Sequence, residues 1–187
     1  MSITINSPVA GVPPIPDIWT TEVNFVDTTT QSGSPIDTPK TILFGAGGTS
    51  GAGIISCDSS GIFTLLKGGP LFIKNRFRVG RTSSTGVSHI FIWAEASFNA
   101  GSTWTVLGNP IATTLDAAAD SQVVFDGAFV NLPKTTLLRQ RFARSSTGSD
   151  FGDLVPLAPS ASLITYGIAT APSAQITVYK ATGYSYT

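Results

Sequence analysis

The chain has 187 residues, of which only 12% are charged, and its eleven basic and eleven acidic residues give a formal net charge of zero. This length suits one domain with a single core, and about a quarter of residues would usually be charged. With no net charge, no overall field draws the protein onto nucleic acid or an anionic membrane, so we expect neither as a partner.

Cysteine content and hydropathy argue against a disulfide-rich or a membrane-spanning protein. Cys57 is the single cysteine, so there is no intrachain disulfide framework, and we expect a small, half-buried apolar residue at this position. The segment Met1 to Asn6 lacks a basic region followed by a hydrophobic run. No stretch approaches the roughly 20 apolar residues that span a bilayer. The sequence therefore indicates a soluble protein without an export signal or membrane anchor.

The first 39 residues differ in composition from the remainder. They contain the prolines Pro8, Pro13, Pro14, Pro16, Pro35 and Pro39. Proline fixes φ and removes a hydrogen-bond donor, so we predict an extended arm over residues 1–39, with an edge strand at Ile18 to Val26. Residues 40–187 are predicted to form the folded domain, with the arm lying across it or across a neighbouring subunit.

From Lys40 onward, runs of β-branched and aromatic residues alternate with Gly, Pro and Asn turn signals every 8 to 15 residues or so. Only Ile111 to Ser121 has a helical composition, with one turn expected at Ala117 to Asp120. The predicted strands are Thr41 to Phe44, Gly53 to Cys57, Ile62 to Lys67, Leu71 to Val79, His89 to Phe98, Thr103 to Leu107, Gln122 to Val130, Thr136 to Ala143, Leu163 to Ile168 and Gln175 to Lys180.

Two of these runs alternate clearly with the period of a strand. Leu71, Ile73, Phe77 and Val79 share one face, whereas Phe72, Lys74, Arg76 and Arg78 share the other. The strand His89 to Phe98 carries apolar groups on both faces, so it is predicted to be central or to lie at a subunit contact. Because no amphipathic helix is present, the fold class is predicted to be all-β, an antiparallel β-sandwich.

The sequence contains no strong motif for a catalytic, cofactor-binding or metal-binding site. The run Gly45 to Gly51 follows a strand, but Ser50 stands where the third glycine of a dinucleotide loop belongs and no helix follows. His89 is the single histidine and lies within a predicted strand, so a Ser-His-Asp site has little support. We predict no enzyme activity, no catalytic residues, no cofactor and no metal, although Asp150 and Asp153 leave a calcium site open.

Basic residues form two rows. Lys74, Arg76 and Arg78 lie on one strand face, and Arg139 and Arg141 lie on another, followed by Arg144. If these strands pair, the rows form a positive ladder able to bind an acidic protein surface, a phosphate or a glycan carboxylate. The alternative is that these cations form salt bridges or are solvated.

The order of elements from Leu66 to Lys180 resembles the jelly rolls of the tumour-necrosis-factor and complement-head families, which also occur in phage virion proteins. The likeness lies in Leu71 to Val79, the aromatic strand His89 to Trp93, the turn before Trp104, Leu132 to Arg144, and the ending Ala174 to Lys180. Those families are homotrimers, so the resemblance implies a jelly roll and a homotrimer contact at Phe91, Trp93 and Tyr179. No collagen-like repeat precedes the domain, which is a departure from complement heads.

The hydroxyl-rich, cysteine-poor composition with a proline-rich arm also resembles phage head-decoration proteins. We therefore expect a structural virion protein made in the host cytoplasm, a capsid decoration or cement protein on the capsid surface. Its partners would be itself and the major capsid protein or another virion protein. The alternative is a carbohydrate- or receptor-binding module of a tail fibre or spike, with a glycan as partner. The candidate interface residues are Phe91, Trp93, Tyr179, Lys74, Arg76, Arg78, Arg139 and Arg141.

Overall fold

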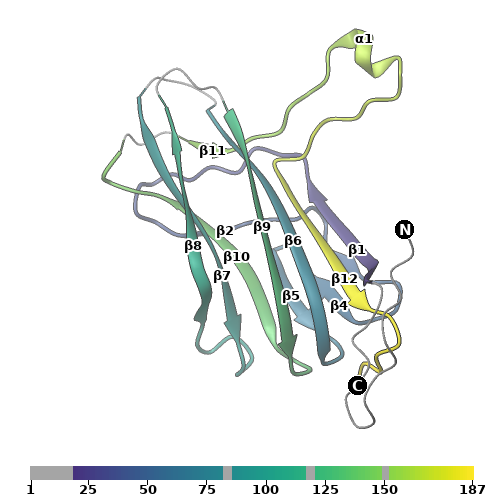
Figure 1. The fold of residues 1–187 in the computed structure, drawn as a ribbon. Coiled ribbons are helices and arrows are strands. Elements are labelled where there is room, and N and C mark those ends of the chain that lie inside the picture. The colour runs from purple at the N-terminus through teal and green to yellow at the C-terminus, as the bar shows by residue number, and fades with distance from the viewer. Residues whose placement is uncertain (1–18, 82–85, 117–120, 149–151) are drawn as a thin grey trace, which may run out of the picture.

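Pairing of the strands divides the chain into two antiparallel sheets, which face each other in the computed structural model (Figure 1). The structure describes residues 19–81, 86–116, 121–148 and 152–187. Its strands are β1 (Trp19–Asp27), β2 (Lys40–Thr41), β3 (Gly48–Thr49), β4 (Ile55–Cys57), β5 (Ile62–Leu65), β6 (Gly69–Gly80), β7 (Ser88–Ser97), β8 (Thr105–Leu115), β9 (Ser121–Leu132), β10 (Leu137–Arg144), β11 (Asp153–Leu154) and β12 (Ala174–Ala181).

We call the two layers sheet A and sheet B. Sheet A has the order β1-β12-β6-β9, with β11 paired to the end of β6. Sheet B has the order β3-β4-β5-β10-β7-β8, with β2 also paired to β10. Consecutive strands therefore cross repeatedly between the sheets, and the resulting order of the main strands is that of a jelly roll. The predicted fold class, an antiparallel jelly-roll β-sandwich, is confirmed.

Alternation along β6 places the core as the sequence predicts. Leu71, Ile73, Phe77 and Val79 are all buried between the sheets, whereas Lys74 is exposed on the outer face. In sheet B, Ile90, Ile92, Leu138 and Phe142 provide the opposing buried surface. The prediction that the aromatic strand is central also holds, because β7 lies between β10 and β8.

The predicted arm is described from Trp19 onward. Strand β1 pairs with β12 along the edge of sheet A, which confirms the edge strand predicted in this part of the chain. Beyond it, Gln31 bonds through its backbone to Leu154 and through its side chain to Leu43. The described part of the arm thus packs on the sandwich, while the division of the chain at residue 39 stays a prediction.

Three predicted elements are wrong, and two of them lie in β8. Gly108-Asn109-Pro110 is one of the turn signals between the predicted strands, but in the structure it is a bulge inside β8, where three residues oppose Trp93 alone on β7. An edge strand tolerates a bulge with a proline, because the missing N–H faces no partner strand. The same strand runs on to Leu115, so Ile111 to Leu115 is not helical, and the turn predicted at Ala117 to Asp120 lies outside the described residues.

The expected strand Leu163 to Ile168 is also absent. Its place is taken by the single helical turn α1 (Ala161–Ile164) in a long connection between β11 and β12. The β-branched composition that suggested a strand finds no neighbouring strand to pair with, because this connection stands away from the sandwich (Figure 1). No helix among the described residues has the length and apolar character to cross a membrane.

The glycines after β2 serve close packing of the backbone. Gly45 and Gly47 have positive φ, and a Cβ at either position would lie within 2.5 Å of a carbonyl oxygen, that of Val26 or Cys57. Glycine is therefore required at both positions to let the strands approach. This explains the glycine-rich run without a bound phosphate.

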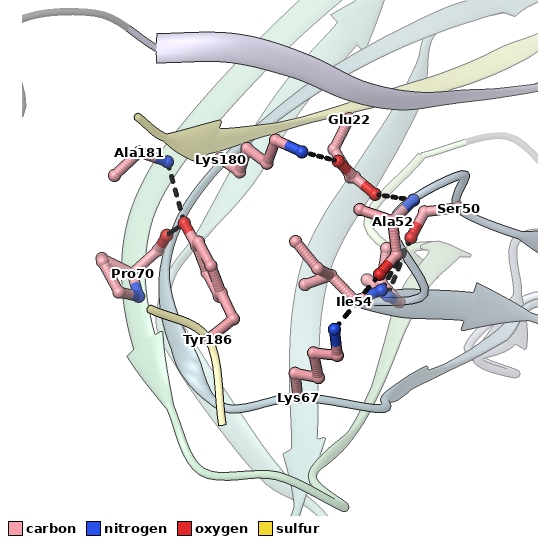
Figure 2. A network of polar contacts seen from close by, with 10 residues as sticks. Glu22, Ser50, Ala52, Ile54, Lys67, Pro70, Lys180, Ala181 and Tyr186 are labelled. Carbon is pink, nitrogen blue, oxygen red and sulfur yellow. Dashed lines mark hydrogen bonds and ion pairs between the residues drawn. The ribbon is translucent and has the colours of Figure 1, made fainter. Parts of the chain in front are cut away.

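A polar network fastens one end of the two sheets together (Figure 2). A bulge in β1 makes Glu22 an extra residue, and its side chain is only 3% exposed. Its carboxylate pairs with Lys180 of sheet A at 2.9 Å and accepts a hydrogen bond from the backbone of Ala52, beside β4 of sheet B, at 2.9 Å. The bulge thus aims one side chain at both layers.

The C-terminal residues complete this end. The Tyr186 hydroxyl accepts a hydrogen bond from the Ala181 amide at 2.8 Å and donates one to the Pro70 carbonyl at 2.5 Å. Gly69 allows this contact, because a Cβ there would lie within 2.6 Å of the Tyr186 ring. The chain end is therefore fixed across the ends of β6 and β12.

The Glu22 network predicts a pH-dependent contribution to stability. Burial acts to raise the pKa of Glu22, but hydrogen bonds from Lys180, Ser50 and Ala52 outweigh it, so the pKa lies below its ordinary value of 4.5. A lowered folded-state pKa stabilises the protein above the ordinary value, and this contribution is lost as pH falls through the folded-state pKa. We expect Glu22→Ala to lower the free energy of unfolding by about 1 kcal/mol at pH 7.

Urea unfolding of wild type and variant at pH 7 and pH 3 measures this difference. It should shrink at pH 3, whereas Thr21→Ala, at an exposed neighbouring position, should have little effect at either pH. An equal loss for Glu22→Ala at both pH values would contradict the assigned role of the carboxylate.

Candidate interaction surfaces

The outer face of sheet A carries a cluster of aromatic side chains, which we call the aromatic face: Trp19, Phe72, Phe125, Phe129 and Tyr179. The register places Phe72 between Phe129 on β9 and Tyr179 on β12, so alternation brings all three to the outer side. The Phe72 and Phe129 rings stack with centroids 4.5 Å apart. Phe125 is 62% exposed and Phe129 is 71% exposed, so the largest apolar groups of β9 face solvent.

Cations accompany these rings. Lys74, Arg76 and Arg78 project from β6 on the same side as Phe72, and the register sets Arg76 opposite Phe125. Arg78 is fixed by hydrogen bonds to the Pro156 carbonyl and the Ser121 hydroxyl. Four candidate interface residues, Tyr179, Lys74, Arg76 and Arg78, therefore lie on the same outer face of sheet A, and their role in an interface stays a prediction.

The outer face of sheet B holds a different arrangement, centred on Glu95. Its carboxylate forms an ion pair with Arg139 at 2.6 Å and accepts a hydrogen bond from the Trp93 indole at 2.8 Å. The Arg139 guanidinium lies 3.9 Å from the centroid of the Trp104 ring. Burial acts to raise the pKa of Glu95, but the bonds from Trp93 and Arg139 prevail and the pKa is lowered.

The predicted positive ladder is wrong. The rows belong to β6 in sheet A and β10 in sheet B, which do not pair and face opposite sides of the molecule. Arg139 is engaged by Glu95, and Arg141 donates to the Pro39 carbonyl at 2.9 Å. Arg144 points inward and is 4% exposed. Sequence spacing gave the correct face for each row but could not assign the rows to sheets.

The predicted aromatic contact also divides between the two sides. Phe91 and Trp93 lie on sheet B, whereas Tyr179 lies on sheet A. Phe91 and Trp93 line a shallow depression of about 350 Å³ together with Val106 and Pro110. These three aromatic residues cannot meet one flat partner surface at the same time.

A projecting apolar loop is the feature that the sequence analysis missed. We call residues 156–172, between β11 and β12, the finger, which extends away from the sandwich in Figure 1. A backbone bridge between Leu157 and Ala171 closes its base. Leu163, Ile164, Tyr166 and Ile168 at its tip are between 47% and 81% exposed. The sequence does contain a signal for this loop, because no charged residue occurs between Asp153 and Lys180 and prolines stand at both ends of the finger.

The remaining candidates have structural surroundings. His89 lies on the outer face of β7, 3.1 Å from the Thr114 hydroxyl. Asp153 is 8% exposed and accepts a hydrogen bond from the Gly33 amide, while Asp150 lies outside the described residues. Within the described ranges, no three His, Cys, Asp or Glu residues are grouped so that they could hold a metal ion.

Comparison with known proteins gives a structural neighbour only. No family model matches the chain, and no curated protein is similar in sequence. The solved globular domain of the zebrafish complement 1qA protein aligns over 83% of this chain and 92% of its own, with a TM-score of 0.44 and 10% identity. Our assignment of the jelly roll depends on the strand order described above.

The buried position of Cys57 can be tested by the reactivity of its thiol. It is 4% exposed, and burial together with the nearby Asp58 charge raises the pKa of its thiol to about 12. Because the thiolate is the reactive form, we expect the folded protein to react with a disulfide reagent at pH 8 about a thousandfold more slowly than the urea-unfolded chain. Absorbance of the released thiol measures both rates, and similar rates would contradict the buried position.

Proposed function

We propose that this chain is a structural protein that works as a homotrimer, and that the trimer is a bacteriophage capsid decoration protein that binds and stabilises the shell. The observation that carries self-association is the exposed aromatic face of sheet A. The number three and the phage context are supported by the sequence resemblance to trimeric jelly rolls and to head-decoration proteins. The proposed partners are a second and third copy of the chain and the major capsid protein or another virion protein.

The aromatic face has the composition of a protein interface. Aromatic residues and arginine are enriched at the centres of such interfaces, and large exposed apolar patches are uncommon on monomers. Phe125 and Phe129 leave most of their surfaces in water, beside Phe72 and Arg76. Covering these rings with a second copy would remove apolar area from water and stabilise the assembly.

The finger supports a second, separate contact. Its tip residues Leu163, Ile164 and Tyr166 lie on a connection away from the aromatic face, so one surface is free to bind copies while the other binds the shell (Figure 1). The bridge at its base and its flanking prolines reduce the entropy lost on docking. A tip without charges suits an uncharged apolar pocket, and such docking should depend little on salt.

The depression on sheet B favours the alternative function, recognition of a glycan as part of a tail fibre or spike. Phe91 is 38% exposed there, next to Trp93, and aromatic faces of this kind stack on sugar rings. Asp153 is 8% exposed and accepts a hydrogen bond from the Gly33 amide, so its carboxylate does not face solvent, where a glycan would bind. A glycan-binding activity lost on Phe91→Ala, in a protein that binds no capsid, would select this alternative.

Self-association through the aromatic face has a direct test. We expect light scattering to give the wild-type protein a mass of three 19.4 kDa chains and the double variant Phe125→Ser, Phe129→Ser the mass of one chain. The loss of two exposed aromatic anchors should weaken association by at least about a hundredfold. The matched double variant Leu163→Ser, Ile164→Ser, in the finger, should keep the wild-type mass. A monomeric wild type would contradict the proposal.

Docking by the finger is tested with capsids that lack this protein. We expect Ile164→Asp to reduce co-sedimentation with such capsids, lowering affinity by about a hundredfold, because a charge would enter an apolar contact. Ala169→Asp places the same charge on an exposed small residue of the same loop and serves as the control. Equal binding by both variants, at wild-type affinity, would exclude the finger as the docking element.

A further inference from the structure

The two sheets do not close along one side, and a groove enters the sandwich there. β8 pairs with β7 and β9 pairs with β6, but no pairing joins β8 to β9 among the described strands. The space between them has a volume of about 430 Å³, a size at which proteins hold small molecules. Its walls are mainly apolar, formed by Ile55, Phe63, Ile73, Ile92, Leu107 and Ile176.

Six polar residues line this space: Asn75, Asp126 and Gln140, which come from both sheets, and Asn109, Asn131 and Arg139. Asn75 of β6 is 2% exposed, Gln140 of β10 is 7% exposed, and Asp126 lies opposite Asn75 on β9. Each occupies an inward position of its strand, in register with core residues. Polar groups placed between two sheets destabilise a sandwich unless they are hydrogen-bonded, so their gathering at one groove requires an explanation.

The hydrogen-bonding of this group is incomplete. The Asn75 amide nitrogen donates to the Asp126 carboxylate at 3.4 Å, whereas the Asn75 Oδ1 atom is buried without a partner. Asp126 has no ion-pair partner among the described residues. The groove therefore offers one buried acceptor without a partner, Asn75 Oδ1, beside a carboxylate that forms no ion pair.

We propose that this groove is a binding site for a small molecule with an apolar body and a primary ammonium group. An ammonium donates three hydrogen bonds and carries the charge opposite to that of Asp126. Its apolar body would lie against Ile92, Leu107 and Ile176. A ligand with a carboxylate would instead meet Asp126 with like charge, and a purely apolar ligand would leave Asn75 Oδ1 unsatisfied. This site goes beyond the proposed function and does not depend on it.

Three probes of equal chain length separate these chemistries: octylamine, octan-1-ol and octanoate, each titrated calorimetrically into the full chain below its aggregation concentration. We expect octylamine to bind about tenfold more tightly than octan-1-ol, because charge-assisted hydrogen bonds are stronger than neutral ones. Octanoate should bind most weakly. Asp126→Asn should remove the preference for the amine over the alcohol while the alcohol still binds.

A second variant tests the location of the site. Ala128 lines the groove and is exposed, so Ala128→Phe should fill the entrance and abolish binding without disturbing the core. Ala112→Phe adds the same ring at an exposed position that the register places beside Phe91 on the outer face, and it should leave binding unchanged.

Several results would overturn the proposal. Binding of octanoate as tight as that of octylamine would remove the role of Asp126, and binding unaffected by Ala128→Phe would place the site elsewhere. No binding of any probe would exclude the groove as a site for such a ligand. Because the oligomeric mass is measured separately, failure of this site leaves the aromatic face and the finger untouched.

Discussion

The surfaces of this protein depend on the alternation of side chains along β6. This strand pairs with β9 over its whole length and with β12 on its other side. Its inward residues Leu71, Ile73 and Phe77 form part of the core. Its outward residues include Phe72 of the aromatic face and Arg76 beside it. A register shift of one residue would exchange the two sets, so burial of the core fixes which side chains reach a partner.

The sequence predicts those parts of the fold that follow from local periodicity. The alternation in Leu71 to Val79 and the apolar faces of His89 to Phe98 are visible in the residues themselves, and both strands form as expected. Pro110 and the β-branched run at Leu163 are misread, because local signals compete with tertiary context. A bulge in an edge strand absorbs the proline, and the run at Leu163 lies where no strand is available to pair with it.

The candidate surfaces are less predictable, because they depend on contacts between residues far apart in the sequence. Nothing in the spacing of Lys74 and Arg139 reveals that their strands belong to different sheets. Likewise, the exposure of Phe129 follows from the edge position of β9, which only the topology shows. Asn75 looks like an interruption of an apolar face in the sequence, and its meaning emerges when Asp126 is found opposite.

Our central claim is that a jelly-roll sandwich with few charged residues presents the rings of β9 to other copies of itself. Side-chain footprinting at increasing protein concentration tests this most directly, because it reports the solvent exposure of individual residues. The account predicts that Phe125 and Phe129 become protected as the protein assembles, whereas Tyr166 of the finger remains reactive. Reactivity of Phe125 and Phe129 that does not change with concentration would contradict it.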